Sequence, residues 1–228
     1  MLETAIRAAR EAGKILFEGS RGEIEVDQTS RRDIKLAMDR KAEAAIVEIL
    51  SQAFPDHGIL AEERGRVGGA SDYLWVIDPL DGTCNYSRRL PIWCTSIGLC
   101  RGDDYQVGVI YEPVTGDLYA AEKGKGATLN GKPIRVSAVE RLEDALVEHS
   151  AGIEEEDIRE SMCIASLLSI AASKVRGLGA AATHLAYVAA GRADAFVDCC
   201  AKRWDVAAGL VLLNEAGGTA TIRERGGD

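Results

Sequence analysis

The sequence has few of the residues on which several common enzyme chemistries depend. Among its 228 residues there are three histidines, and the six cysteines form no C-x-x-C pair, which excludes zinc-ribbon and thioredoxin-like sites. No cysteine is followed by an arginine six positions later, and the patterns D-x-D, R-H-G and H-E-x-x-H do not occur. These absences exclude the phosphocysteine, aspartyl-nucleophile, phosphohistidine and zincin mechanisms.

Long apolar runs and an excess of positive charge are missing as well. No stretch approaches the ~20 apolar residues of a membrane span, and the charged, periodic N-terminus does not resemble a secretory signal. Lys and Arg total 27 against 36 Asp and Glu, a formal net charge of -9. Nucleic-acid duplexes and anionic membranes require a cationic surface, so neither is expected as a partner. Free thiols indicate a reduced, cytoplasmic protein.

The rest of the composition, 46% hydrophobic and 28% charged, is typical of a globular protein. Apolar periodicity predicts helices at about 2–17, across 42–50 up to Pro55, and at 154–173, 181–190 and 204–216. Strands are predicted at 58–62, 73–78, 92–100, 106–111, 117–121, 145–148 and 193–198, with a loop at 65–69 and a tight turn at Asn130-Gly131. This order predicts a mixed α/β (α+β) single domain, with lobes at about 1–145 and 146–228.

The segment from Trp75 to Tyr86 carries the most chemical information. A buried strand brings Asp78 to its C-terminal end, where Pro79 is expected to stop it, and Asp81 follows three residues later. Two carboxylates with the Leu80 carbonyl between them are hard oxygen ligands of the kind that Mg²⁺ prefers. The alternative is an Asp-Pro turn followed by an Asp-Gly reversal, because both are common in loops.

Two further acidic positions support the metal interpretation. Glu62 and Glu63 end a predicted strand, and Asp205 begins a predicted helix. Each position also has an ordinary explanation, a solvated turn for the glutamates and an acid at the helix dipole for Asp205.

Together these stretches resemble the inositol monophosphatase family, within the lithium-sensitive, magnesium-dependent sugar phosphatases. The family motif W-x-x-D-P-x-D-G-T-x-N-F matches residues 75–86, with Tyr86 in place of Phe, and W-D-x-A-A-G-x-x-L-x-x-E-A-G-G matches residues 204–218. The G-E-E, G-x-A-A and V-A-x-G-x-A-D stretches correspond to residues 61–63, 179–182 and 188–194. The resemblance spans essentially the whole chain and implies a layered αβαβα sandwich.

The resemblance also implies roles for individual residues. The implied ligands of two or more Mg²⁺ ions around a phosphate are Glu62, Asp78, the Leu80 carbonyl, Asp81 and Asp205. Thr83 matches the threonine that orients the attacking water, Asp39 matches the acid that hydrogen-bonds this threonine, and Glu62 could assist deprotonation of the water. The implied substrate contacts are Asp81, Gly82, Thr83, Gly179, Ala180, Ala181 and Asp198. Clustered Mg²⁺ suits phosphate-ester hydrolysis, which needs an activated water, neutralised phosphoryl oxygens and a stabilised leaving group.

The chain departs from the family pattern in three places. Gln28 stands where many members carry a lysine, and Arg31, Arg32 or Lys35 could replace its charge. Ala180 stands where Ser or Thr is usual, so one hydroxyl contact is lost. The family continues past E-A-G-G with another strand and helix, whereas only residues 219–228 remain here, so we expect a truncated or minimal version.

The sequence therefore predicts a cytoplasmic, homodimeric, Mg²⁺-dependent phosphomonoesterase for inositol 1-phosphate or a similar polyol or sugar phosphate. Fructose-1,6-bisphosphatase, histidinol-phosphatase and 3'-phosphoadenosine 5'-phosphate phosphatase share the same metal residues and remain open as alternatives. A different class also remains open, namely a catalytically weak scaffold that binds metal or phosphate.

Overall fold

The computed structural model describes residues 1–22, 24, 26–29 and 34–222. Its helices are α1 (Leu2–Ser20), α2 (Ala37–Ala53), α3 (Thr83–Ser87), α4 (Glu155–Ala171), α5 (Ala181–Ala189) and α6 (Arg203–Glu215), with one 3-10 turn, η1 (Leu142–Asp144). Its strands are β1 (Val26–Thr29), β2 (Ile34–Leu36), β3 (Gly58–Ala61), β4 (Gly65–Val67), β5 (Tyr73–Asp81), β6 (Cys94–Arg101), β7 (Asp104–Glu112), β8 (Asp117–Glu122), β9 (Ala127–Leu129), β10 (Lys132–Pro133), β11 (Leu146–His149), β12 (Lys174–Arg176) and β13 (Ala195–Val197).

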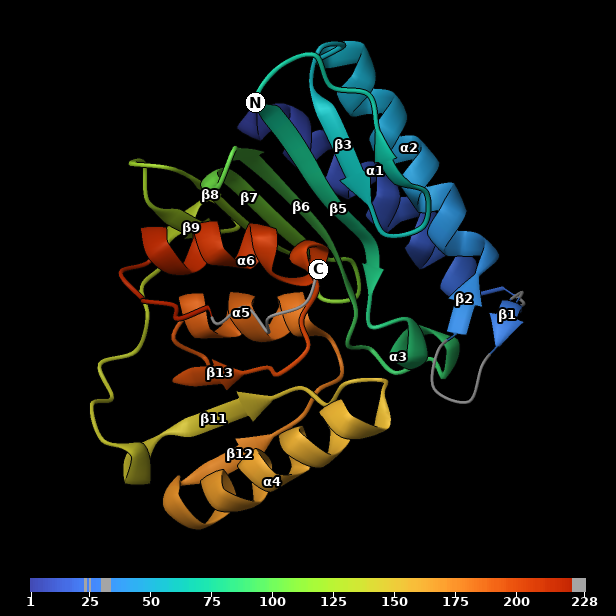
Figure 1. The fold of residues 1–228 in the computed structure, drawn as a ribbon. Helices are drawn as coiled ribbons and strands as arrows, with labels where there is room; N and C mark the ends of the chain where they lie inside the picture. The colour runs from blue at the N-terminus through green and yellow to red at the C-terminus, as the bar shows by residue number, and fades with distance from the viewer. Residues whose placement is uncertain (23, 25, 30–33, 223–228) are drawn as a thin grey trace.

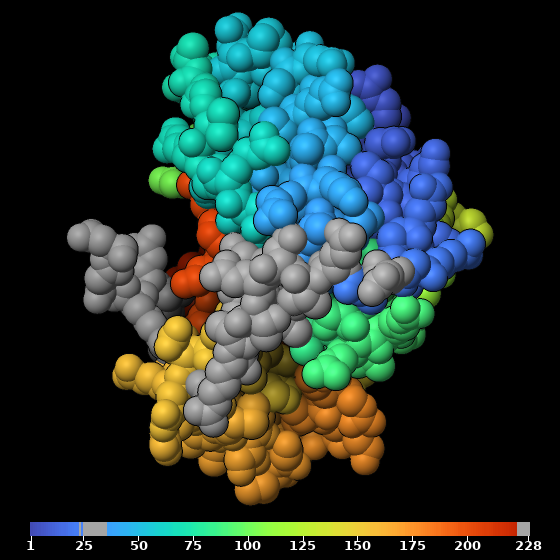
Figure 2. Space-filling model, turned by 90° about the vertical axis from the view of Figure 1, so that its right-hand side faces the viewer, coloured from blue at the N-terminus to red at the C-terminus, as the bar shows by residue number. Residues whose placement is uncertain are grey.

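These elements form five layers (Figure 1). An eight-stranded sheet has the order β10-β9-β8-β7-β6-β5-β3-β4, with α1 and α2 on one face and α6 and α5 on the other. Beyond α5 lies a three-stranded parallel sheet, β12-β11-β13, and α4 covers its outer face. The turned view in Figure 2 shows the α1–α2 layer above and the small-sheet layer below. The predicted α+β class and αβαβα layering are confirmed.

The main core lies between α1, α2 and the large sheet. Ala5, Ala9, Ala12 and Leu16 of α1 recur at helical spacing and are fully buried, because small side chains on one stripe let the helix approach the sheet closely. From the sheet, Trp75 is among the largest fully buried side chains. Burial of this apolar surface holds the large sheet in place, so the polar side chains at the ends of its strands have fixed positions.

Two strand predictions were wrong, for identifiable reasons. Pro79 does not end its strand, since β5 runs on to Asp81 and its register against β6 shifts between Asp78 and Asp81. At a register shift the residue need not donate a hydrogen bond to the neighbouring strand, so proline, which has no N–H, is tolerated there. The Pro79 carbonyl accepts a hydrogen bond from the Thr95 hydroxyl at 2.9 Å. Residues 65–67, expected as loop, pair antiparallel with β3. The Asn130-Gly131 turn is confirmed, with φ of +52° and +76°.

Helix α6 packs directly on the large sheet, although it follows the small sheet in the chain. Two strand glycines make this close approach possible. A Cβ atom on Gly98 would lie 2.8 Å from the Ala207 Cβ, and one on Gly108 would collide with the Ala208 carbonyl. Glycine inside a strand commonly marks such a close approach of backbone. The contact brings the first turn of α6, with Asp205, to the edge where β5 ends.

Among the described residues, no helix is both long enough and apolar enough to cross a membrane.

Candidate active site

Four acidic side chains gather at one edge of the large sheet. Asp78 and Asp81 lie at the carboxyl end of β5, and Glu62 directly follows β3. Because β3 and β5 are parallel neighbours, their carboxyl ends meet at the same edge, where ligands bind in α/β sheets. Asp205 comes to this edge from the first turn of α6. The structure therefore brings together all four acids that the sequence motifs singled out.

Their charges act on one another. Burial, followed by the charge of Asp205, raises the pKa of Glu62 to about 8. Burial, followed by the charges of Glu62 and Asp81, raises the pKa of Asp78 well above its usual range. Burial and the Asp81 charge raise the pKa of Asp205 to about 7. Burial also raises the pKa of Asp81. Four carboxylates placed this closely cannot all ionise without a compensating cation.

Backbone N–H groups hold three of these carboxylates in place. The Asp81 oxygens accept from the N–H groups of Ala181 and Ala182 at 3.1 and 2.7 Å. Asp78 Oδ1 accepts from the Leu80 N–H at 3.0 Å, and Asp205 Oδ2 accepts from the N–H of Lys202 at 2.6 Å. A carboxylate offers about four lone-pair sites, so each of the three retains capacity for a further ligand.

The chemistry of this donor set fits a hard divalent cation. Every side-chain donor is a carboxylate, and the Leu80 carbonyl lies between two of them in the chain. In the described part of the chain, no three Asp, Glu, His or Cys side chains already converge on a single point as metal ligands. An ion would therefore bind after a movement of these side chains, which can keep their present hydrogen bonds because each carboxylate has further lone pairs.

The turn after β5 presents Thr83 to the cluster. Gly82 has a φ of +91°, and a Cβ atom there would lie 2.9 Å from the Ile92 carbonyl oxygen, so only glycine fits. The Thr83 hydroxyl donates to the Leu80 carbonyl at 3.0 Å. Asp39 Oδ2 accepts from the Leu36 N–H at 3.0 Å at the start of α2. The expected bond between Thr83 and Asp39 stays a prediction.

A buried glutamate that the sequence analysis missed supports the Glu62 turn. Glu43 lies on α2, is 1% exposed, and accepts hydrogen bonds from the Glu63 N–H at 2.9 Å and from Arg64 Nε at 2.7 Å. It follows Asp39 by four positions, so both acids lie on the same face of the helix. The four-residue spacing between Asp39 and Glu43 is the sequence signal that could have identified Glu43.

The predicted substrate contacts lie where the small sheet ends. Gly179, Ala180 and Ala181 lead into α5, and Asp198 directly follows β13 and accepts from the Cys200 N–H at 2.7 Å. Beside them is a cavity of about 330 Å³ lined by His149, Ser150, Ala151, Gly177 and Gly179. The carboxyl ends of the three parallel strands meet at this side of the site. The sequence analysis did not identify His149 and Ser150, which lie at and just beyond the end of a predicted strand.

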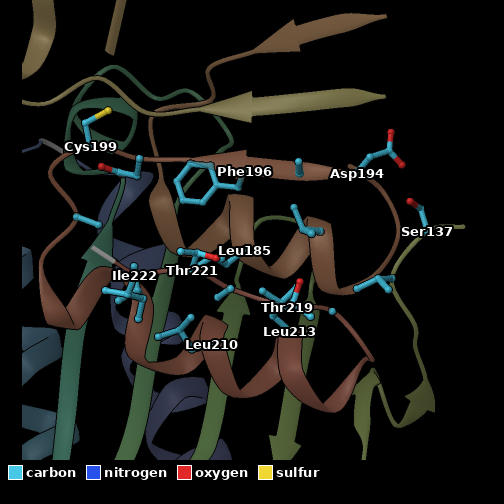
Figure 3. A pocket seen from close by; sticks show the side chains of 18 of the residues that line it. Ser137, Leu185, Asp194, Phe196, Cys199, Leu210, Leu213, Thr219, Thr221 and Ile222 are labelled. Carbon is cyan, nitrogen blue, oxygen red and sulfur yellow. The ribbon is translucent and has the colours of Figure 1, made fainter. Parts of the chain in front are cut away.

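A larger hollow, of about 1150 Å³, lies between α5, α6, β13 and the segment 217–222 (Figure 3). Its lining mixes apolar side chains such as Leu185, Phe196 and Leu210 with polar ones such as Asp194 and Thr221. Of the described residues that line it, none is one of the four clustered acids, and it adjoins the site at the loop 198–202 and at Val206. The carboxylate cluster, rather than this larger hollow, is therefore the candidate active site.

The proposed substitutes for the family lysine cannot be placed. Arg31, Arg32 and the side chains of Gln28 and Lys35 lie outside the described residues, so their role stays a prediction.

Comparison with known proteins places the chain in a family. The family model described as "Inositol monophosphatase family" matches residues 1–227. The protein named Nus factor SuhB of Xylella fastidiosa is 41% identical over 217 residues, which cover 93% of this chain and 78% of that protein. Its namesake from Pseudomonas aeruginosa is 38% identical over 226 residues, covering 96% and 83% of the two chains.

Solved structures agree with this assignment. The inositol monophosphatase of Anabaena (Nostoc) superposes with a TM-score of 0.86 at 38% identity, covering 95% of this chain and 81% of that one. The IMPase of Thermotoga maritima gives a TM-score of 0.83 at 34% identity, covering 95% and 83%. With this fold, these motifs and this acidic edge, the chain belongs to the inositol monophosphatase family.

Proposed function

We propose that this protein is a Mg²⁺-dependent phosphomonoesterase that hydrolyses inositol 1-phosphate or a similar polyol or sugar phosphate. One observation carries the proposal. Three separate elements, in a chain of this family, bring four acids to one edge, where burial and mutual repulsion raise their pKa values. Such an arrangement is costly unless a cation and an anionic substrate complete it.

Glu62, Asp78, the Leu80 carbonyl, Asp81 and Asp205 would hold the metal. Bound Mg²⁺ supplies neutralisation of charge on the phosphoryl oxygens and lowers the pKa of water. A cluster that is anionic by itself would then attract a phosphate.

The chain's own groups would position and deprotonate the attacking water. The Thr83 hydroxyl already donates its proton to the Leu80 carbonyl. Its oxygen lone pairs could accept a hydrogen bond from water, and rotation of the hydroxyl toward Asp39 would exchange the bond to Leu80 for the one that the resemblance implies. Glu62, as the resemblance implies, would accept the proton of the water, since bound Mg²⁺ would favour its ionised form. Asp39 at the start of α2 would support Thr83, and the backbone N–H groups of Gly82 and Thr83 would bind phosphate oxygens.

The leaving group would occupy the cavity beside Gly179. His149 and Ser150 line this cavity and would offer polar groups to the hydroxyls of a polyol. Asp198, which lines the larger hollow, would contact the substrate from the loop after β13. Ala180 contributes no hydroxyl. The Ala181 N–H is already donated to Asp81, so a substrate would contact this residue through its methyl group or carbonyl.

A phosphate-release assay tests the proposal. The substrates are inositol 1-phosphate, fructose 1,6-bisphosphate, histidinol phosphate and 3'-phosphoadenosine 5'-phosphate, each with Mg²⁺, with EDTA, and with Mg²⁺ plus Li⁺. We expect Mg²⁺-dependent release, greatest with inositol 1-phosphate and inhibited by Li⁺. Preference for another ester would reassign the substrate, and no release from any ester would refute the enzyme.

A second candidate comes from the names of the relatives. The proteins at 36–41% identity are called Nus factor SuhB, so a role of that kind, without turnover, remains open for this chain. Such a role would fit a catalytically weak scaffold that binds phosphate or metal. An Asp78→Asn variant separates the two, because it should abolish hydrolysis and leave a non-catalytic role intact.

We also propose that the protein acts in the cytoplasm as a homodimer, each protomer a single domain with lobes at about 1–145 and 146–228. Light scattering should give twice the mass of one chain.

A further inference from the structure

A buried polar pair lies beneath the segment that leads into α5. His184 is on α5 and Glu148 is on β11, and their side chains are among the least exposed in the chain. His184 Nδ1 lies 3.1 Å from Glu148 Oε2. The two atoms are close without the alignment of a hydrogen bond, and neither has a hydrogen-bond partner among the described residues. Burying two such groups is costly, so their placement calls for a role.

The hydrogen bond of the other His184 nitrogen indicates what the pair does. Nε2 accepts a hydrogen bond from the Leu178 N–H at 3.3 Å. A ring nitrogen that accepts carries no proton, so the proton of the imidazole is on Nδ1, which faces Glu148. Glu148 thereby selects the tautomer that can hold Leu178. The Phe196 ring stacks on the imidazole at 4.8 Å and keeps its plane fixed.

The Leu178 peptide is held from both sides. Its N–H is bound by His184, and its carbonyl accepts from Asn85 Nδ2 at 2.7 Å. Three and four residues further on, the N–H groups of Ala181 and Ala182 bind Asp81. The Leu178 anchor therefore determines where the start of α5 meets the carboxyl end of β5.

We propose that Glu148 and His184 are positioning residues that hold the segment 178–182 against Asp81 and so set the affinity of the acidic cluster for a divalent cation. The positioning stands on geometry alone, and the effect on cation affinity rests on the proposed function. In the described structure neither side chain hydrogen-bonds to the cluster, although a charge on His184 would act through space to lower the pKa of Asp81. Their action passes through the Leu178 peptide and the N–H groups at the start of α5.

The test compares three variants in the full chain. His184→Leu removes the acceptor for Leu178. Glu148→Gln keeps an oxygen that can accept from Nδ1 and is the conservative variant. Tyr187→Phe is the matched control, because it lies on the same helix and loses a hydroxyl bond to Glu112 while the bond between His184 and Leu178 stays in place.

The first measurement is hydrogen–deuterium exchange. In His184→Leu we expect exchange across 177–183 to rise at least about tenfold, with residues 203–215 of α6 unchanged. Glu148→Gln should stay within about twofold of the parent and Tyr187→Phe should match it. Equal exchange in His184→Leu and the parent, or a uniform rise over the whole chain, would overturn the positioning role. If His184→Leu does not fold, Glu148→Leu takes its place, with a smaller rise expected in the same segment.

The second measurement is Mg²⁺ binding by calorimetry, without substrate. His184→Leu should weaken Mg²⁺ binding about three- to tenfold. The separate variant Glu148→Gln should keep the affinity of the parent. Unchanged affinity in His184→Leu would refute the link to the cluster. A parent that binds Mg²⁺ and hydrolyses no ester would refute the proposed function and leave this inference standing, so the two failures are distinguishable.

Discussion

Asp78 and Glu112 are buried to nearly the same degree, 3% and 2% exposed, yet their surroundings are opposite. Asp78 is surrounded by other carboxylates, and the charges of Glu62 and Asp81 add to burial in raising its pKa. Glu112 accepts hydrogen bonds from the hydroxyls of Tyr187 and Tyr119 at 3.2 and 3.4 Å.

A cation completes the environment of Glu112. Arg192 donates to the Tyr119 hydroxyl at 2.6 Å, pairs with Asp117 at 2.9 Å, and lies over the rings of Tyr119 and Tyr187. Burial is the main cause that raises the pKa of Glu112 to about 7, while the two tyrosines and Arg192 act to lower it.

The comparison of these two buried acids distinguishes a structural network from a candidate functional site. The Glu112 network finds its partners within the chain, joining β7, β8 and α5, and so acts as a structural connection. The cluster around Asp78 has an excess of acidic groups that the described residues do not balance. A buried imbalance of this kind lowers stability and is kept where a ligand completes it.

The largest effect is expected for Asp78→Asn. Hydrolysis should fall about 1000-fold or more, because a metal ligand and a negative charge are lost together. Stability without metal should rise by about 1 kcal/mol, since a like charge leaves the cluster. Assays of kcat/KM and urea unfolding in EDTA measure both effects. Asp104→Asn, on the exposed surface, is the control and should leave activity unchanged; a destabilised Asp78→Asn protein would contradict the comparison.

Glu112→Gln tests the balanced region through pH. The folded pKa of Glu112, about 7, lies above its ordinary value of 4.5. Its contribution to stability is therefore complete below pH 4.5 and is lost as pH rises through 7.

Relative to the parent, Glu112→Gln should gain on the order of 2 kcal/mol in unfolding free energy between pH 4.5 and 8. Urea unfolding of both proteins across this range measures the difference, and kcat at pH 8 should not change. A difference that does not vary with pH would mean that Glu112 is ionised in the folded protein throughout.

Asp198→Ala should have the smallest effect. Loss of a hydrogen bond to a substrate hydroxyl should raise KM about three- to tenfold, with kcat within about twofold. Lys132→Ala, on the exposed strand β10 at the opposite edge of the large sheet from β3 and β4, serves as the control and should match the parent. If Asp198→Ala changes neither KM nor the preference among esters, Asp198 belongs to the structural region rather than to the substrate site.

Much of the fold was accessible from local patterns. Apolar spacing predicted α1, α5 and α6 because each helix buries one continuous face or its whole surface. Strands β4 and β12 were missed, since three residues carry too little periodicity. Pro79 was misread because a register shift depends on the neighbouring strand.

The sequence by itself determined which acids are the candidate metal ligands, because carboxylates at such spacings in two long motifs are a local property of the chain. Only the tertiary structure decided what each acid is bonded to. Asp81 finds its N–H donors on Ala181 and Ala182, 100 and 101 positions away. Pairs as distant as these, and the Glu148–His184 pair, leave no local signal, since their partners are chosen by the packing of α5 between the two sheets.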